Sequence, residues 1–145
     1  MARVPGISAG LLMAVSMAVA VAIPAPAWAG GPGGVVDTGV VSRAVGSGVR
    51  DGLLVGFTAT GPTNEMAASA VIAACQAAGA QQCSSDEQTN DVFCIASVGA
   101  DDGSGIVSGG AGPTPEAARE DAFRHVASAN LTLAPSARIL ASSCP

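Results

Sequence analysis

Residues 61–67, GPTNEMA, recur 51 positions later as GPTPEAA at residues 112–118. The match extends backwards, because nine of the 27 columns in residues 41–67 are identical to those in residues 92–118. Self-similarity at a fixed offset is typical of an internal duplication. Each copy reads as a strand, an Asp-Gly turn, a second strand, a helix cap and a helix. One repeated unit therefore predicts the architecture of the chain.

The two copies predict an α+β fold. In the first copy, strand-like residues flank Asp51-Gly52, and Thr63 precedes a helix expected over residues 64–78. In the second copy, Asp102-Gly103 takes the place of the turn and Thr114 caps the helix. We expect two related ββα units, each followed by a short strand. Together they are expected to form one antiparallel sheet with two Ala-rich helices on one face, stapled by disulfides.

Three shorter segments complete the expected pattern. Residues 92–98 have the strongest strand pattern in the chain, with Phe-Cys-Ile-Ala-Ser at its centre. Residues 81–84 are expected to be a short strand followed by a polar loop over residues 85–90. Residues 138–143 are expected to form a closing strand.

The first 29 residues are expected to be a signal peptide. Arg3 supplies a positive start, residues 7–23 are apolar and uncharged, and Ala27-Trp28-Ala29 fits the small-x-small rule for cleavage after Ala29. The alternative is a transmembrane anchor, but 17 residues are at the short limit for a span. We therefore expect a protein secreted or held in the cell envelope, with no membrane span after cleavage.

The rest of the chain is short enough for one domain. Residues 30–40, rich in glycine and valine, are expected to be a flexible lead, and residues 41–145 are expected to form a single α+β domain. Within that domain the duplication divides the chain into residues 41–91 and 92–145.

The charge of the mature chain argues against two classes of partner. After loss of Arg3, five arginines and no lysine stand against eleven acidic residues, a formal charge of −6. Binding to nucleic acid needs clustered cations that displace counterions, and binding to anionic lipid needs them too. Abundant alanine, glycine and valine without lysine also suggest a high-GC bacterial genome.

Four cysteines in an exported chain predict disulfides rather than a metal site. Cys75, Cys83, Cys94 and Cys144 include no Cys-x-x-Cys pair, and the chain holds one histidine. We expect no metal and no cofactor. Three pairings are possible. We favour Cys75–Cys83, which ties the first helix to the following strand, and Cys94–Cys144, which ties two strands together.

The cysteines belong to a wider motif that also includes the Ala-rich helices. It comprises Cys75, Ala-Gly-x-x-x-Cys83, Phe93-Cys94-Ile95-Ala96, Gly-x-Thr114 and Ser143-Cys144. This motif resembles the exported bacterial family called domain of unknown function 4189. The resemblance covers roughly residues 41–144, and the first hairpin departs from it because residues 41–49 contain no aromatic residue. It implies a secreted or envelope protein of mycobacteria or related actinobacteria, and it supplies no catalytic residue.

His125 is the only histidine and the one candidate for acid–base chemistry. A catalytic set would need a nucleophile and a carboxylate brought to it, and no surrounding motif suggests one. Asp121, four residues earlier, more simply forms a pair with His125 on the helix surface. The helix stripe expected to pack on the sheet comprises Ala118, Ala122, His125 and Ala129.

The acidic and glycine-rich segments predict loops rather than ligand sites. Residues 101–105, DDGSG, lack the alternate acids and distal glutamate of a calcium loop and read as a turn. Residues 103–112 are rich in glycine but have no lysine at phosphate-loop spacing. Asp86, Glu87 and Asp91 are expected to form a solvated acidic loop, with docking to a basic partner as the alternative.

The sequence alone favours an extracytoplasmic binding or interaction module. The expected partner is an unknown extracytoplasmic protein or envelope component. One alternative is a secreted protease inhibitor that presents the stapled loop of residues 84–91. Another is a secreted hydrolase that uses His125.

Overall fold

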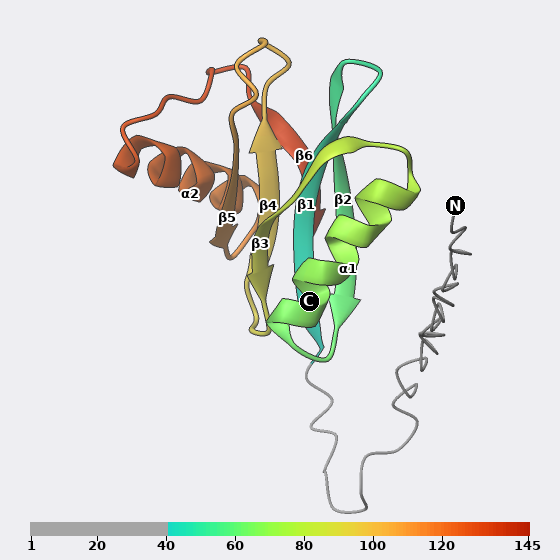
Figure 1. The fold of residues 1–145 in the computed structure, drawn as a ribbon. Helices are drawn as coiled ribbons and strands as arrows, with labels where there is room; N and C mark the ends of the chain where they lie inside the picture. The colour runs from blue at the N-terminus through green and yellow to red at the C-terminus, as the bar shows by residue number, and fades with distance from the viewer. Residues whose placement is uncertain (1–40) are drawn as a thin grey trace, which may run out of the picture. The chain divides into compact units, whose positions relative to one another are not determined.

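The computed structural model describes residues 41–145; the predicted signal peptide and lead, residues 1–40, lie outside the described residues. The order strand, strand, helix, strand occurs twice (Figure 1), so the fold is α+β with two similar halves, residues 42–89 and 94–143. The elements are β1 (Ser42–Arg50), β2 (Leu53–Gly61), α1 (Asn64–Ala77), β3 (Gln81–Thr89), β4 (Cys94–Gly99), β5 (Val107–Gly112), α2 (Pro115–Ser128) and β6 (Arg138–Ser143).

The strands form two antiparallel sheets rather than the single sheet expected from the sequence. The first half gives a sheet with the order β2-β1-β3, and the second half gives one with the order β5-β4-β6. Each helix packs on the strands of its own half (Figure 1), so the helices do not share one face. The expectation of one sheet with both helices on one face was therefore wrong.

The two sheets pack face to face between the helices. β2 contacts β6, β1 contacts β4, and β3 contacts β5, while α1 and α2 cover the outer faces. Both central strands are buried along almost their whole length. A single sheet with helices on one side would have left one face of those strands in water. The result is four layers, in the order helix, sheet, sheet, helix.

The duplicated GPT motif builds the same helix start twice. Thr63 and Thr114 have nearly identical extended backbones, and their side chains accept hydrogen bonds from the nitrogens of Met66 and Ala117 at 3.2 and 3.1 Å. Both predicted N-caps are therefore confirmed. Within residues 41–145, neither helix is long and apolar enough to cross a bilayer.

The two hairpins close differently, and the offset between equivalent residues of the two copies changes by one residue across them. Asp51-Gly52 makes a two-residue turn with φ of 53° and 77°, the geometry of a tight hairpin. Asp102-Gly103 lies in a longer loop that joins β4 to β5. β1 pairs Ser42 with the last residue of β2, and β4 pairs Cys94 with the last residue of β5. Equivalent residues of β1 and β4 are therefore 52 positions apart, not 51.

Glycines allow the sheets to approach closely at both edges. A side chain at Gly56 of β2 would collide with the backbone of Leu140 in β6. One at Gly109 of β5 would collide with the backbone of Asp86 in β3. The space between the sheets is therefore narrow where β2 meets β6 and where β3 meets β5.

Both predicted disulfides are confirmed. Cys75 of α1 bonds to Cys83 of β3, with Cα atoms 5.8 Å apart. Cys94 of β4 bonds to Cys144, which follows β6, with Cα atoms 4.2 Å apart. Each bridge therefore lies within one half of the molecule.

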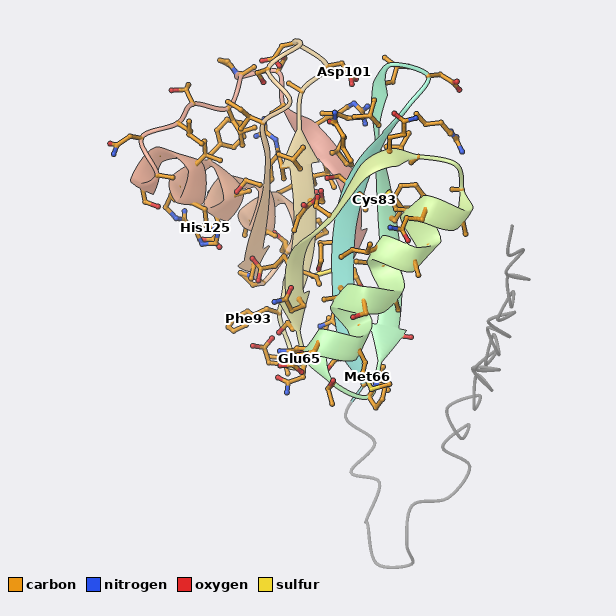
Figure 2. The ribbon with its side chains drawn as sticks, in the orientation of Figure 1. Glu65, Met66, Cys83, Phe93, Asp101 and His125 are labelled. Atoms are coloured by element: carbon orange, nitrogen blue, oxygen red, sulfur yellow. A yellow bond between two sulfur atoms is a disulfide. The ribbon has the colours of Figure 1, made fainter. Side chains whose placement is uncertain are left out.

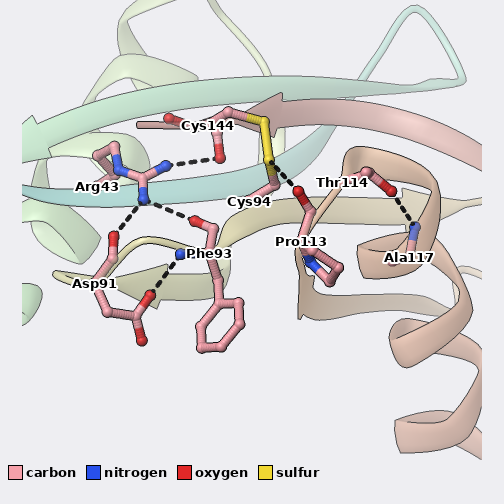
Figure 3. The surroundings of a disulfide bond; sticks show 9 residues. Arg43, Asp91, Phe93, Cys94, Pro113, Thr114, Ala117 and Cys144 are labelled. Carbon is pink, nitrogen blue, oxygen red and sulfur yellow. Dashed lines mark hydrogen bonds between the residues drawn. A yellow bond between two sulfur atoms is a disulfide. The ribbon is translucent and has the colours of Figure 1, made fainter.

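A buried arginine ties the two halves together beside the second disulfide (Figure 3). Arg43 of β1 is only 8% exposed. Its guanidinium donates to the carbonyl oxygens of Ser143, Asp91 and Phe93 at 2.8, 2.9 and 2.7 Å. Three backbone acceptors thus replace the water that a buried cation loses.

Candidate functional site

A cluster of polar side chains lies between the two sheets. Ser47 of β1 and Ser97 of β4 are 2% and 0% exposed. Because neighbouring residues of a strand face opposite sides, these serines point away from the helices that cover Gly48 and Ala96. The layer between the two sheets, which could have been wholly apolar, therefore contains hydroxyl groups.

The centre of the cluster is the carboxylate of Asp86. Ser97 donates to its Oδ2 at 2.5 Å, and Ser84 donates to its Oδ1 at 2.6 Å. The Oγ atoms of Ser47 and Ser84 lie 3.3 Å apart. Asp86 and Ser84 come from β3, so the network links strands of both sheets and both halves.

Asp86 occupies a β-bulge. The ladder between β1 and β3 pairs Gly46 with Ser85 and Val45 with Glu87, so Asp86 has no partner of its own. A bulge re-aims the side chain of its extra residue, and bulges are common beside functional sites. Asp86 is therefore an extra residue of β3, and its carboxylate reaches Ser97 of the other sheet.

The other half carries a bulge at the equivalent place. Ser97 and Val98 are neighbours in β4, but they pair with Ala141 and Ile139 of β6. Leu140 is therefore left without a partner. When the offset of 52 positions between β1 and β4 is applied, the two bulges fall at the same step. Asp86 and Leu140 are therefore equivalent positions, one charged and one apolar.

A cavity of about 290 Å³ opens beside the carboxylate. It is smaller than the usual pocket for a drug-sized ligand. Its wall contains polar side chains, aliphatic side chains and two glycines. Its lining comprises Ser47, Gly48, Val49, Leu54, Gln82, Ser84, Asp86, Gly105 and Val107.

Cys83 and Asp101, both labelled in Figure 2, locate two parts of the cavity wall. Cys83 lies on β3 between two lining residues, and Asp101 lies in the β4–β5 loop that supplies Gly105. Gln82 and Gly105 are exposed, while Ser47 is buried. The cavity therefore runs from solvent toward the buried hydroxyl groups.

Asp86 has no cationic partner among residues 41–145. The ion pairs described there join Arg138 to Asp101, and Arg124 and His125 to Asp121. A partly buried carboxylate with only hydroxyl donors is an incomplete arrangement, because buried charges are usually paired or bound to metal. In the same part of the chain, no group of three or more acidic, histidine or cysteine side chains is placed to hold a metal ion.

His125 lies at the margin of the packed stripe of α2 and not within it (Figure 2). Ala118, Ala122 and Val126 are the buried residues of this helix, and the His125 side chain is 53% exposed. The expectation that His125 belongs to the packed stripe was wrong, because it is half exposed and contacts only the edge of β5. The stripe turns so that Val126 takes the buried position.

Both ring nitrogens of His125 are engaged. Nδ1 lies 2.7 Å from the carbonyl oxygen of Gly109, and Nε2 lies 3.3 Å from Oδ2 of Asp121. The predicted surface pair with Asp121 is therefore confirmed. The hydroxyl of the nearby Ser128 donates to the backbone carbonyl of His125 and not to its ring. This geometry offers no nucleophile–histidine pair.

Asp121 holds its position through several donors. It accepts a hydrogen bond from the Ala111 nitrogen at 3.0 Å and one from Arg124 at 2.9 Å. Partial burial would raise the pKa of Asp121, but these hydrogen bonds and the charges of Arg124 and His125 lower it on balance. The cluster fastens α2 to β5.

The expected acidic loop is not a loop. Residues 81–89 form one continuous strand, so Asp86 lies between the sheets and Glu87 is half-buried. Burial raises the pKa of Glu87 above its ordinary value. Asp91 accepts a hydrogen bond from the Phe93 nitrogen, and this bond lowers the pKa of Asp91. The protruding loop expected for a protease inhibitor at residues 84–91 is therefore absent.

The acidic turn at residues 101–105 has a structural role at its first residue. Asp101 accepts a hydrogen bond from the Leu54 nitrogen at 2.8 Å and one from Arg138 at 3.1 Å. The Leu54 hydrogen bond, together with Arg138, lowers the pKa of Asp101. Arg138 also donates to the Leu54 carbonyl oxygen at 3.1 Å. These contacts hold the rim of the cavity, because Leu54 is one of its lining residues.

The serines around Asp86 were missed at the level of sequence, although one signal pointed to them. A bond from Cys83 to the first helix turns that side chain toward α1. Strand alternation then turns Ser84 toward the opposite face, where the second sheet lies. A polar residue on a face that must be buried is a candidate for function.

No family model, curated protein or solved structure matches this chain. The resemblance to the family called domain of unknown function 4189 therefore stays a prediction.

Proposed function

We propose that this protein is an extracytoplasmic binding module that holds a small ligand in the cavity between its two sheets. The observation that carries the proposal is the position of Asp86. Its carboxylate lines a cavity, lies in the layer between the sheets, and has no cationic partner among residues 41–145. A ligand that supplies the missing partner would complete the arrangement.

A purely structural role explains the carboxylate less well. The fold itself needs no charge at this bulge, because the equivalent position in the second half is Leu140. The side chain of Leu140 lies beside Leu54 and Gly99, so its surroundings are apolar. Burying a carboxylate costs free energy unless its hydrogen bonds repay it, and an apolar residue of similar size avoids that cost. Deviations from the apolar rule are expected at functional sites.

Export is part of the proposal. The two disulfides are consistent with an oxidising compartment outside the cytoplasm. The sequence of residues 1–29 favours a cleaved leader, and the resemblance to an exported actinobacterial family points the same way. The full chain, expressed in an actinobacterial host, should appear in the culture medium or envelope without residues 1–29. An intact mass that retains the leader would contradict export and leave the cavity unaffected.

The binding function can be tested by ligand-observed NMR. The exported product of the full chain is mixed with a set of small cationic, anionic and neutral fragments. Binding should map to the amide signals of Gly48 and Gly105. It should disappear in Val107→Trp, which fills the cavity, and persist in His125→Gln, which lies outside it. Fragments that bind only at other surfaces, or none that bind at all, would refute a binding cavity.

A further inference from the structure

Hydrogen-bond directions fix what the polar wall of the cavity can offer. Ser84 gives its single hydroxyl proton to Asp86 at 2.6 Å. In the contact between Ser84 and Ser47, the proton must therefore come from Ser47. Ser97 likewise gives its proton to the second carboxylate oxygen. All three hydroxyl protons are committed to a chain that ends on Asp86.

The remaining capacity of Asp86 and Ser47 is therefore for accepting hydrogen bonds. A carboxylate has about four acceptor sites, and the two serines fill two of them. Ser47 Oγ keeps its lone pairs as well, because it acts as donor in the only side-chain hydrogen bond described for it. At Asp86 and Ser47 a ligand that offers only acceptors would meet lone pairs, while a ligand that donates can bind both residues together.

The charge of Asp86 selects among donors. Charge-assisted hydrogen bonds are about twice as strong as neutral ones, and their strength grows where protein replaces water. Ser47 at the inner end of the cavity is 2% exposed, so that end is largely shielded from solvent. A cationic donor is therefore favoured over a neutral alcohol or amide.

The aliphatic part of the lining limits the rest of the ligand. Val49, Leu54 and Val107 are aliphatic, and the cavity volume is about 290 Å³. Such walls favour a short apolar chain that carries the cation at one end. A bulky or strongly polar group would not fit beside them.

We infer that the cavity recognises a primary ammonium group on a short aliphatic chain, with the ammonium bound by Asp86 and Ser47 and the chain lying along Val49, Leu54 and Val107. This inference rests on the proposed binding function and names its ligand class. The ammonium provides three donors for the acceptors of the wall. Ser84 and Ser97 act as positioning residues that orient the carboxylate.

The test compares three molecules of nearly equal size. ¹⁵N-labelled protein, exported as the full chain, is titrated at pH 7 and constant ionic strength with n-propylammonium chloride, n-propanol or sodium propionate. We expect saturable shifts of the Gly48 and Gly105 amide signals with n-propylammonium, and binding at least about tenfold weaker for n-propanol. Sodium propionate should not bind in the cavity.

Variants separate the charge from the shape of the cavity. Asp86→Asn keeps the size of the side chain and should weaken n-propylammonium binding by at least about tenfold. His125→Gln is the matched control and should bind as the wild type does. The comparison of the three ligands on the wild type decides the case even if Asp86→Asn fails to fold.

The outcomes distinguish this inference from the proposed function. If n-propanol or propionate binds in the cavity as tightly as n-propylammonium, the ligand class is wrong and the binding function stands. The same holds if n-propylammonium does not bind there but other fragments of the screen do. If no molecule of either set binds in the cavity, both the ligand class and the binding function are wrong.

Discussion

The bulges of β3 and β6 occupy the same position in the two halves and hold opposite kinds of side chain. Asp86 in β3 collects hydroxyl groups from both sheets, while Leu140 in β6 lies beside Leu54 and Gly99. The duplicated backbone therefore tolerates either an apolar or a charged residue at this step. The comparison shows that the fold sets the geometry of the position and that the first half has placed a polar group in it.

The largest expected effect concerns the two disulfides, which staple the halves unequally. Cys94–Cys144 spans 50 residues and Cys75–Cys83 spans eight. Loop-closure entropy predicts a loss of about 4 kcal/mol for the double variant Cys94→Ser with Cys144→Ser, and about 2.5 kcal/mol for Cys75→Ser with Cys83→Ser. Guanidinium unfolding of both variants gives the free energies of unfolding. A larger loss for the short loop would contradict the entropic explanation.

The second effect exchanges the chemistry of the bulges. Leu140→Asp places a carboxylate beside Leu54 and Gly99, without the serine donors that Asp86 has. It should lower the free energy of unfolding by about 3 kcal/mol. Leu140→Asn is the control for shape and should cost less, because it carries no charge. Asp86→Asn should change stability by about 1 kcal/mol or less. Equal losses for Leu140→Asp and Asp86→Asn would mean that the two bulges have the same surroundings.

A smaller effect concerns the contact of Asp101 with Leu54 and Arg138. Its pKa is lowered in the folded state, so this carboxylate stabilises the fold above the ordinary pKa of aspartate. That contribution is lost as the pH falls through the lowered value. Asp101→Asn should therefore reduce the melting temperature at pH 7, with the reduction vanishing in strong acid. The same reduction at every pH would point to shape rather than charge.

The smallest effect concerns Glu87, the neighbour of Asp86 on β3. Burial raises its pKa, so the folded protein holds this proton to higher pH than the unfolded chain does. The stability that protonation provides is present at low pH and is lost as the pH rises through the raised value. Glu87→Gln should therefore raise the melting temperature slightly at pH 7 and leave it unchanged in acid. A decrease at pH 7 would show that the Glu87 charge is stabilising.

Local signals allowed much of the fold to be predicted from sequence. Thr63 and Thr114 mark helix starts because a cap acts on residues three positions away, and residues 138–143 form the strand that their pattern predicts. The disulfide pairing followed from element order. Each of these features depends on neighbours along the chain.

What could not be predicted depends on contacts between the halves. The division into two sheets is decided by β3 returning to β1 and β6 returning to β4, and short segments leave such pairing open. The bulge at Asp86 shifts a register that the alternation of residues 81–89 does not show. Ser97, which donates to Asp86, and Ser143, which accepts from Arg43, both lie in the other half, so no short sequence window contains these contacts.

The most direct measurement follows the two bulges in one titration. The ¹³Cγ signal of Asp86 and the methyl signals of Leu140 are recorded while n-propylammonium is added to the exported protein at pH 7. A saturable shift at Asp86, with Leu140 unchanged, is the result predicted for a cation site that only the first half contains. Linear shifts of similar size at both positions, or no shift at Asp86 at all, would contradict it.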